Sequence, residues 1–273
     1  MNYVFTTIYP SSKKYFNEFI ESLNEQSNKN FKIFIVLNGT SLSKTQKKKI
    51  LNEYTIFNTN TAWQNARIKG LKKLLKLNPK NIIFIDSDDL MRADRIKNNL
   101  KEIKKYNFVV NNCYLFKKEK KVNKIWLSRK RGDIKLSHIK YKNFIGCTNT
   151  IVRAKSLKKI INKINVNLTA FDWCMAKLLL IKKFKGLYTS TPLSYYRQYA
   201  QNTSSLIEIT QKKVLKDIEY KIEHYKYFEK FGINYTKQIL ELENKFKKIN
   251  NKKYYSMIKK KFKSNNQYWW SSI

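Results

Sequence analysis

The sequence is poor in the side chains that build the commonest metal and disulfide sites. Its 273 residues include 3 cysteines and 2 histidines. Cys113, Cys147 and Cys174 share no metal-type spacing, and an odd number of cysteines does not suit a disulfide framework. His138 and His224 are too few for a zinc site. These shortages exclude a disulfide-stapled secreted domain and favour a reducing, cytoplasmic compartment.

Long hydrophobic runs and a secretory leader are also missing. No apolar stretch approaches the roughly 20 residues that a membrane-spanning helix needs. The chain opens with Met1-Asn2-Tyr3-Val4 and goes directly into a strand-like run, without the basic region and cleavage site of a signal peptide. With 42% hydrophobic residues, the chain can bury one substantial core. We therefore expect a globular, cytoplasmic protein.

Acidic residues are scarce as well, at 19 against 57 lysines and arginines, which gives a formal net charge of +38. A biased genome would raise Glu together with Lys, so the excess of bases predicts an anionic partner: a membrane surface, a nucleic acid or a phosphorylated substrate. Lysines interleaved with aromatic residues keep a nucleic-acid-binding protein as an alternative. The small number of arginines argues against sequence-specific base reading, so we expect no specific nucleic acid partner.

The most informative segment that is present joins a buried strand to three carboxylates. The apolar run from Asn81 to Ile85 has the length and β-branched content of a parallel strand, and Asp86, Asp88 and Asp89 follow it directly. Open α/β sheets bind ligands at the carboxyl ends of their strands. Clustered carboxylates there predict a hard divalent cation that accompanies a phosphorylated substrate. The alternative is an acidic turn in which Asp88 or Asp89 caps the next helix.

Strands and helices alternate through the first part of the chain. Hydrophobic patterning predicts strands at 3–8, 31–37, 55–57 and 81–85, and helices at about 16–23, 43–54, 62–75 and 93–105. This order predicts a parallel sheet covered by helices on both faces.

The pattern changes in the second part of the chain. It predicts strands at 108–116, 122–126 and 147–152, a basic loop at 129–143, and helices at 156–164 and 172–183. From residue 206 onward the chain reads as basic helices rich in Tyr and Phe. We expect one α/β domain over residues 1–205 and a helical, basic extension over residues 206–273.

Six motifs occur in an order that matches a known family. They are Val4–Pro10, Phe31–Thr40 with its ending Leu37-Asn38-Gly39-Thr40, Asn65–Leu71, Asp86-Ser87-Asp88-Asp89, Phe171-Asp172-Trp173, and Leu193–Tyr199 with the trailing Asn202-Thr203-Ser204. Together they resemble the family 2 glycosyltransferases with the GT-A fold, of the bacterial lipooligosaccharide or capsule type. The resemblance covers roughly residues 1–205.

This resemblance implies a fold, a reaction and its partners. The fold would be α/β: a Rossmann-like, nucleotide-binding, mostly parallel sheet flanked by helices. The reaction would be inverting transfer of a sugar from a nucleotide-diphosphate sugar, with a UDP-sugar favoured, to a glycan or lipid-linked acceptor. Residues 1–115 would bind the donor and residues 116–205 the acceptor. The pathway would be biosynthesis of cell-surface polysaccharide or lipooligosaccharide.

The resemblance also assigns chemical roles. Asp172 matches the family's catalytic base, which takes the proton of the acceptor hydroxyl; a plain helix cap is the alternative. Asp88 would be the direct metal ligand and Asp86 would reach the metal or the ribose. Two carboxylates plus substrate phosphates suit Mg²⁺ or Mn²⁺.

The donor site would draw on polar side chains from several motifs: Thr7, Tyr9, Asn38, Arg67, Asp86, Arg197 and Tyr199. Thr7, Tyr9 and Asn38 would hold the base and ribose, although Asn38 before Gly39 is also typical of a turn. Arg67 would contact the diphosphate or brace the acidic loop, or would simply be a solvated charge on a helix. Arg197 and Tyr199 suit a phosphate or an acidic partner.

Three positions depart from the family pattern. Asn38 replaces an acid, which leaves the nucleobase open. Phe171 replaces a Glu before the base. Tyr199 stands where the family often has His, and Tyr is a poor ligand for Mg²⁺ or Mn²⁺. The requirement for a metal therefore stays open, and a catalytically inactive binding module is an alternative.

The C-terminal extension predicts a place for the protein in the cell. Lysines are mixed there with aromatic residues, and the chain closes with Tyr268-Trp269-Trp270. Trp and Tyr favour the membrane–water interface, and each Lys near an anionic surface contributes on the order of 1 kcal/mol. We expect a peripheral protein at the inner face of the membrane. A helical cap packed on the catalytic domain is the alternative.

Overall fold

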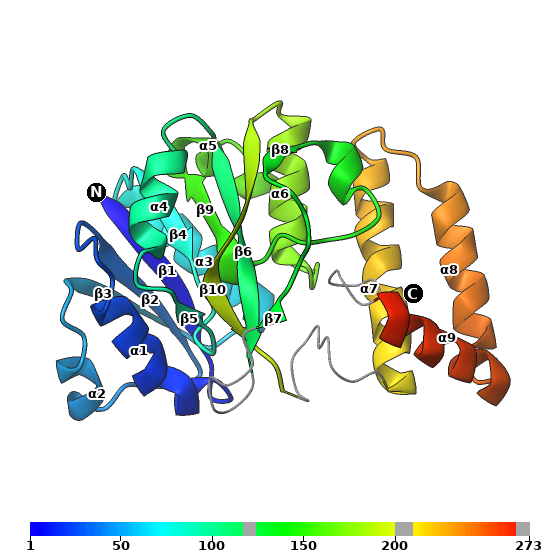
Figure 1. Cartoon of the computed structure of the whole chain (residues 1–273), viewed down its shortest axis with the longest axis horizontal. Coiled ribbons are helices and arrows are strands. Elements are labelled where there is room, and N and C mark those ends of the chain that lie inside the picture. The colour runs from blue at the N-terminus through cyan, green and yellow to red at the C-terminus, as the bar shows by residue number, and fades with distance from the viewer. Residues whose placement is uncertain (117–123, 200–209, 266–273) are drawn as a thin grey trace.

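The computed structural model describes residues 1–116, 124–199 and 210–265. Its centre is a ten-stranded sheet whose main path runs in the order β3-β2-β1-β4-β9-β6-β10-β5 (Figure 1). The strands are β1 (Asn2–Ile8), β2 (Lys32–Asn38), β3 (Tyr54–Thr59), β4 (Asn81–Phe84), β5 (Leu90–Met91), β6 (Phe108–Phe116), β7 (Lys124–Ile125), β8 (Gly132–Ile134), β9 (Thr150–Arg153) and β10 (Gly186–Arg197).

The first four strands are parallel, as the alternation of strands and helices predicts. β1 lies between β2 and β4, and β3 pairs with the outer side of β2. Parallel neighbours need crossover connections, and helices provide them. Their carboxyl ends therefore share one edge of the sheet, which is where the acidic motif lies.

The second half of the sheet is mixed rather than parallel. β9 inserts antiparallel between β4 and β6, while β10 runs parallel to β6. The short strands β5, β7 and β8 add antiparallel pairs. This fold is the α/β, GT-A-like arrangement expected from the sequence, with more antiparallel pairing than "mostly parallel" implies.

Local expectations were wrong at several points. The strand expected at 147–152 begins at Thr150, because a 3-10 turn (Cys147–Asn149) precedes it. The helix expected at 43–54 is limited to α2 (Lys44–Lys48). β10 continues through Pro192. Irregular pairing on either side of Pro192 accommodates a residue that has no N–H to donate.

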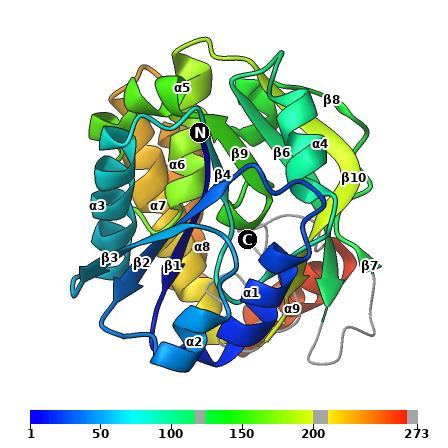
Figure 2. The ribbon, with the colours of Figure 1, turned by 90° about the vertical axis from the view of Figure 1, so that its left-hand side faces the viewer.

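Helices cover both faces of the sheet (Figure 2). Alternate strand residues point to opposite faces, so Val4 and Phe5 belong to two different cores. One core includes residues of α1 (Phe16–Asn24) and α4 (Arg95–Glu102), and the other includes residues of α3 (Trp63–Lys76), α5 (Ala154–Lys158) and α6 (Phe171–Ile181).

Gly70 explains how closely α3 approaches the sheet. A Cβ at this position would lie 2.3 Å from Cγ2 of Val36 on β2. Any other residue would push the helix away from the strand. Arg67 lies one turn earlier on the same helix, so this close packing also fixes the distance of Arg67 from the strand ends.

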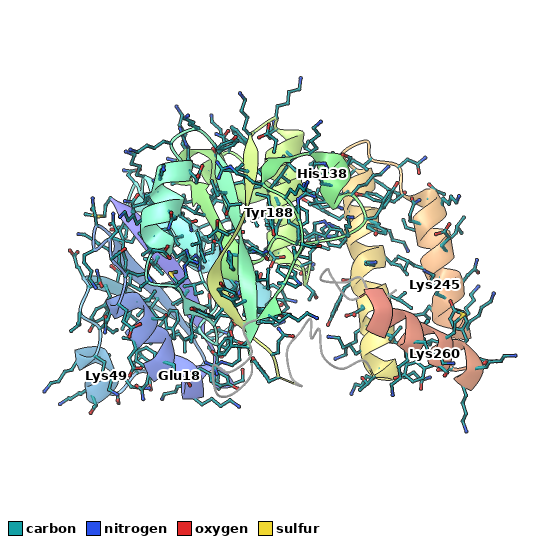
Figure 3. The ribbon with its side chains drawn as sticks, viewed as in Figure 1. Glu18, Lys49, His138, Tyr188, Lys245 and Lys260 are labelled. Atoms are coloured by element: carbon teal, nitrogen blue, oxygen red, sulfur yellow. The ribbon has the colours of Figure 1, made fainter. Side chains whose placement is uncertain are left out.

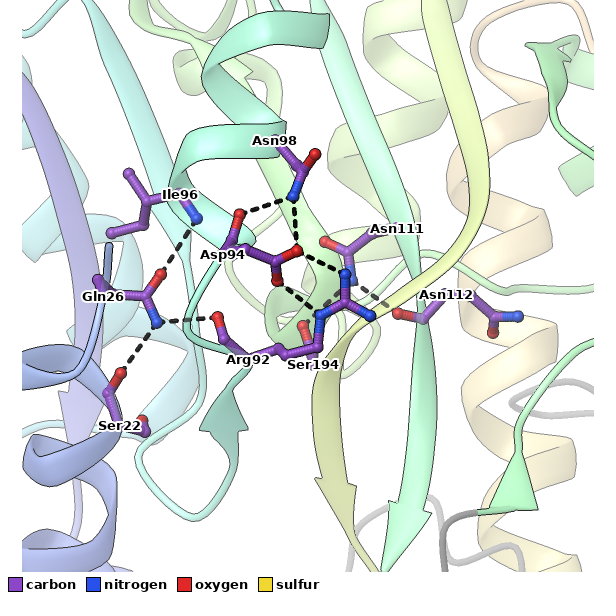
Figure 4. A network of polar contacts seen from close by, with 9 residues as sticks. All are labelled: Ser22, Gln26, Arg92, Asp94, Ile96, Asn98, Asn111, Asn112 and Ser194. Atoms are coloured by element: carbon purple, nitrogen blue, oxygen red, sulfur yellow. Dashed lines mark hydrogen bonds and ion pairs between the residues drawn. The ribbon is translucent and has the colours of Figure 1, made fainter. Parts of the chain in front are cut away.

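Polar contacts fix the segment that follows the acidic motif (Figure 4). The side-chain amide of Gln26 donates to the carbonyl of Arg92 and accepts from the N–H of Ile96. The guanidinium of Arg92 makes two bonds to the carboxylate of Asp94, which also accepts from Asn98. The end of α1 is thereby tied to β5 and to the start of α4.

The C-terminal part is helical, as expected, with α7 (Gln211–Glu229), α8 (Thr236–Lys248) and α9 (Lys252–Asn265). α7 lies beside α6 in both ribbon views (Figures 1 and 2). Val214, Ile218, Tyr225 and Phe228 belong to the same apolar core as α6. Over the described residues, no helix is both long and apolar enough to span a bilayer. The expectations that concern residues 202–204 and 268–270 lie outside the described residues.

Candidate active site

The candidate site lies at the carboxyl ends of the parallel strands, where β4 leads into Asp86-Ser87-Asp88-Asp89. Ser87 is buried and its hydroxyl donates to the carbonyl of Thr7 at the end of β1 (2.9 Å). This bond fixes the acidic loop to the neighbouring strand. The backbone that carries the carboxylates of the loop is therefore held in place.

The Asp86 carboxylate forms an ion pair with the guanidinium of Arg67. Nη2 of Arg67 lies 2.7 Å from Oδ1 of Asp86, and Thr148 donates to Oδ2 at 3.2 Å. The Arg67 guanidinium also stacks near the ring of Phe171, 5.5 Å from its centroid. With an exposed side-chain fraction of 12%, Arg67 is not a freely solvated helix charge. It braces the acidic loop.

Asp88 is paired with Tyr199. The Tyr199 hydroxyl donates to Oδ2 of Asp88 at 2.6 Å, and Nε of Arg197 donates to the Asp88 carbonyl at 2.7 Å. Burial raises the pKa of Asp88, and the negative charge of Asp86 raises it further. The Asp88 carboxyl group therefore loses its proton less readily than a solvent-exposed aspartate does.

Asp89 is a structural brace. It is buried, accepts from the backbone N–H of Arg197 at 2.7 Å and accepts from the Thr148 hydroxyl. Burial raises its pKa well above the ordinary range, and Asp88 and Asp86 add to the effect. The expected alternative of a helix cap is wrong, because the N-cap of α4 is Asp94.

Arg197 finds an acidic partner, which was one of its two expected partners. Its Nη2 lies 2.9 Å from Oε2 of Glu18 on α1. Its guanidinium also lies over the rings of Tyr15 (4.3 Å) and Phe116 (4.5 Å). Arg197 therefore ties the end of β10 to α1 and to the acidic loop.

Asp172 belongs to the first turn of α6 and interacts electrostatically with Arg67 and Asp86. Ala170, not Asp172, is the N-cap of this helix, so the cap alternative is wrong. Oδ1 of Asp172 accepts from the N–H of Trp173 at 2.7 Å and from Nδ2 of Asn143 at 3.4 Å. Burial raises the pKa of Asp172 to about 7, partly opposed by Arg67. A carboxyl group with this pKa can accept a proton near neutral pH.

The residues expected to hold the nucleoside lie at the ends of β1 and β2. Thr7 is buried beneath the loop. The Tyr9 hydroxyl donates to the carbonyl of Trp63 at 3.2 Å. Both ends of the Asn38 amide bond the backbone of Thr61, at 2.9 and 3.0 Å. In this structure Asn38 is the last residue of β2, and its side chain braces the loop after β3.

Sequence reasoning missed three residues that organise the site. Thr148 bridges Asp86 and Asp89, and Asn143 contacts Asp172; both belong to the stretch between β8 and β9, where no motif marks them. Arg95 lies fully buried behind the loop and donates to the carbonyl of Phe84 at 2.6 Å. Burial lowers its pKa to about 10. No signal in the sequence marks Arg95 as buried, because burial depends on long-range packing.

The chemistry of the donor set fits a hard divalent cation held by few protein ligands. Asp86 and Asp88 supply carboxylate oxygens, and the raised pKa of Asp88 indicates negative charge that a cation would neutralise. No cluster of three or more His, Cys, Asp or Glu residues suited to a metal occurs in the part of the chain that the structure describes. Such a site would depend on substrate phosphates for the remaining ligands, as Mg²⁺ sites often do.

Comparison with solved structures shows the same fold in glycosyltransferases. The S. aureus TarS 1–349 structure with UDP is 18% identical with a TM-score of 0.54, over 81% of this chain and 64% of that chain. The TarS 1–349 structure with UDP-GlcNAc is 16% identical with a TM-score of 0.57, over 93% and 82%.

A third similar structure is the mannosyltransferase PcManGT from Pyrobaculum calidifontis with GDP-Man and Mn²⁺. It is 11% identical with a TM-score of 0.57, over 89% of this chain and 68% of that chain. At these identities the likeness shows the fold alone. No curated protein matches the sequence.

The sequence itself matches a family model over residues 3–161, which is more than half of the 273 residues. The matched region includes β1 to β4 and the acidic loop, and it ends before Asp172. The chain belongs to glycosyl transferase family 2.

Proposed function

We propose that this protein is an inverting glycosyltransferase that moves a sugar from a nucleotide-diphosphate sugar, with a UDP-sugar favoured, to a glycan or lipid-linked acceptor. The observation that carries the proposal is the position of Asp172. Asp172, a carboxyl group with a pKa of about 7, interacts electrostatically with the same guanidinium, Arg67, that is bonded to Asp86 of the acidic loop. Inversion at a sugar carbon requires a base for the attacking hydroxyl and a group that neutralises the leaving diphosphate, and Asp172 and the acidic loop are the candidates for these two roles.

Different residues would carry out proton transfer, charge stabilisation and metal binding in this reaction. Asp172 takes the proton of the acceptor hydroxyl as that oxygen attacks the sugar carbon. Arg67, fixed by Asp86, keeps positive charge between the base and the acidic loop. Asp88 and Asp86 would hold Mg²⁺ or Mn²⁺, which would supply neutralisation of the leaving diphosphate. Tyr199 orients the Asp88 carboxylate through the bond to Oδ2.

Support for a nucleotide-sugar donor comes from the site and from similar proteins. The similar structures are complexes with UDP, UDP-GlcNAc and GDP-Man, and the GDP-Man complex includes Mn²⁺. These ligands belong to those proteins. For this chain they support a nucleoside diphosphate at the strand ends, beside Thr7, Tyr9 and Asn38.

We further propose that the acceptor belongs to cell-surface polysaccharide or lipooligosaccharide biosynthesis, and that the enzyme works as a peripheral protein at the cytoplasmic face of the membrane. The net charge of +38 supports attraction to an anionic surface. Exposed lysines lie at both ends of the long axis in Figure 3, with Lys49 after α2 and Lys260 on α9.

Hydrolysis of UDP-sugars tests the proposal without knowledge of the acceptor. The full chain with Mn²⁺ should release UDP slowly, because water can replace the acceptor hydroxyl. A panel of UDP- and GDP-sugars should also include one that raises the unfolding temperature, since a bound ligand stabilises the folded state. Stabilisation without any UDP release over the panel would indicate an inactive binding module. Neither effect, together with tight binding of single-stranded RNA, would indicate a nucleic-acid-binding protein.

A further inference from the structure

The most unusual side chain outside the site is Lys177 on α6. It is fully buried, five residues after Asp172 on the same helix. No acidic side chain forms an ion pair with it over the residues that the structure describes. Burial lowers its pKa well below the ordinary lysine value, and the cations of Lys221 and Lys140 add to the effect. A simple apolar core would not place an amine here.

Two oxygens and four aromatic rings surround the Lys177 amine. Nζ donates to the Tyr235 hydroxyl at 2.8 Å and to the carbonyl of Lys140 at 3.0 Å. The rings that face it have their centroids at 4.3 to 5.5 Å and belong to Trp173, Tyr235, Phe228 and Tyr225. We call this set of rings the Lys177 cage. The Lys177 side chain on α6 thus contacts three other parts of the chain: α7, the residue before α8 and the backbone of Lys140.

The cage also reaches the residue next to the proposed base. Trp173 follows Asp172 directly, and its ring stacks on His224 of α7 (centroids 4.0 Å apart, 15° between planes). Nε1 of Trp173 donates to the carbonyl of Ile139 at 2.7 Å. Contacts with the C-terminal helices and with residues 139–140 therefore hold the first two turns of α6 in place.

Apolar contacts alone would leave the register of α6 against α7 poorly determined. Flat aromatic faces can slide past one another at small cost, whereas two directed hydrogen bonds from one amine are satisfied in one arrangement. Buried polar groups are known to fix register at some cost in stability. A helix that shifts by about 1 Å at its first turn would misplace Asp172, and such shifts can reduce rate by about 10²-fold.

We propose that Lys177 is a positioning residue: through the Lys177 cage, the C-terminal helices set the place of Asp172, and α7 is part of the catalytic unit. This inference rests on the proposed function for the role of Asp172. It predicts that stability and catalysis respond in opposite ways to loss of the amine.

The decisive variant is Lys177→Met, which keeps the length and the packing of the side chain. The Tyr235 hydroxyl already donates to the carbonyl of Lys140 at 3.1 Å, so this carbonyl keeps a partner. Replacing a buried amine with an apolar group is often neutral or stabilising. We expect an unchanged or higher unfolding temperature, unchanged affinity for UDP with Mn²⁺, and kcat reduced at least tenfold.

Two further variants calibrate this result. Tyr235→Phe removes one of the two acceptors and keeps the ring, so it should reduce kcat in the same direction by a smaller factor. Lys226→Met is the matched control, because it makes the same substitution on α7 at a side chain that is 59% exposed and whose 3.6 Å ion pair with Glu243 is weakened by solvent. It should leave kcat, UDP affinity and the unfolding temperature unchanged.

Hydrogen exchange provides a readout that does not depend on activity. Amides of residues 171–181 should exchange at least tenfold faster in the folded Lys177→Met protein than in wild type and in Lys226→Met. Wild-type exchange and wild-type kcat in Lys177→Met would overturn the proposal, because the amine would then only fill space. If the wild-type chain shows no transfer at all, the proposed function fails, and the exchange result still decides whether Lys177 fixes α6.

Discussion

At the scale of single residues, the site is governed by which carboxylates can be ionised. Asp86 has a guanidinium beside it, Asp88 has a hydroxyl, and Asp172 is buried with partial compensation from Arg67. These different surroundings support the proposed division between a phosphate-handling cluster and a proton acceptor. Enzymes commonly assign acid and base roles in this way.

The role of Asp172 leads to a pH prediction. As a base it must be deprotonated, and burial raises its pKa to about 7. UDP release should therefore fall as pH decreases through about 7 and level off above it. Asp172→Asn should cost roughly 10²–10⁴-fold in rate and abolish this step in the profile. Affinity for UDP should stay near wild type in a calorimetric titration. Weak UDP binding with normal turnover would place Asp172 in the nucleotide site.

The neighbouring residues Asp88 and Asp89 should respond differently to alanine. Asp88→Ala should abolish transfer but leave unfolding within about 1 kcal/mol of wild type, since lost repulsion offsets the lost bond to Tyr199. Asp89→Ala should cost about 1–3 kcal/mol, because it leaves buried donors on Arg197 and Thr148 without their acceptor. Denaturant unfolding measures both. Equal stability losses, or a tenth of wild-type activity in Asp88→Ala, would contradict the assignment.

At the scale of elements, the contact between α6 and α7 buries a titratable side chain, His224, whose pKa depends on its neighbours. His224 is buried against Trp173 and Phe228, and both of its ring nitrogens lack a hydrogen-bond partner over the described residues. Burial lowers the pKa of His224 well below its ordinary value, and Lys177 lowers it further. The imidazole is therefore held neutral in the folded protein.

This arrangement predicts acid sensitivity with a definite sign. Below the unfolded pKa of about 6.5, the unfolded chain binds a proton at His224 that the folded chain does not bind. From about pH 7 to 5, His224 lowers stability by up to about 1.4 kcal/mol per pH unit as pH decreases, whereas the raised pKa values of Asp172, Asp88 and Asp89 act in the opposite direction. The difference between wild type and a variant without the imidazole isolates the contribution of His224. His224→Phe keeps the ring stacking and should remove this contribution. Thermal unfolding of both proteins at several pH values is the measurement. Parallel curves would exclude His224 as the cause.

At the scale of the whole molecule, charge is the dominant feature. Lysines and arginines outnumber acids by 57 to 19, and the ion pairs of the described residues engage few of them. Exposed basic side chains on α8 and α9 lie at the end of the molecule away from β3 (Figure 3). Exposed charges of this kind act through screened, long-range attraction rather than through fold stability.

Binding to liposomes should therefore depend on lipid charge and on salt. The full chain should cosediment with anionic vesicles at low salt, bind neutral vesicles weakly, and lose binding as salt rises to about 0.5 M because the Debye length shortens. Deletion of residues 256–273 should weaken binding. A truncated chain that binds as well as the full chain would show that residues 256–273 do not contribute to membrane binding. Binding that does not depend on lipid charge would contradict the electrostatic proposal itself.

The sequence by itself determined the features that depend on local pattern. The parallel order of β1 to β4 follows from periodicity and crossover rules, and the acidic loop follows from an apolar run that ends in carboxylates. The helical C-terminal part follows from composition. Asp86 and Asp88 were marked by their place after the apolar run, and Arg67 and Asp172 by the resemblance of their motifs to the family 2 glycosyltransferases.

Only the tertiary structure decided which groups meet. Thr148, Asn143 and Arg95 join the site from segments without motifs, because burial and pairing depend on long-range packing. The path of β10 through Pro192 is set by its neighbour β6, which overrides the local tendency of proline to end a strand. Tyr235 lies 58 residues from Lys177 in the chain, so their contact could not be read from sequence spacing. Sequence fixes the chemical groups, whereas three-dimensional packing selects the few pairs that are close enough to share a proton or a charge.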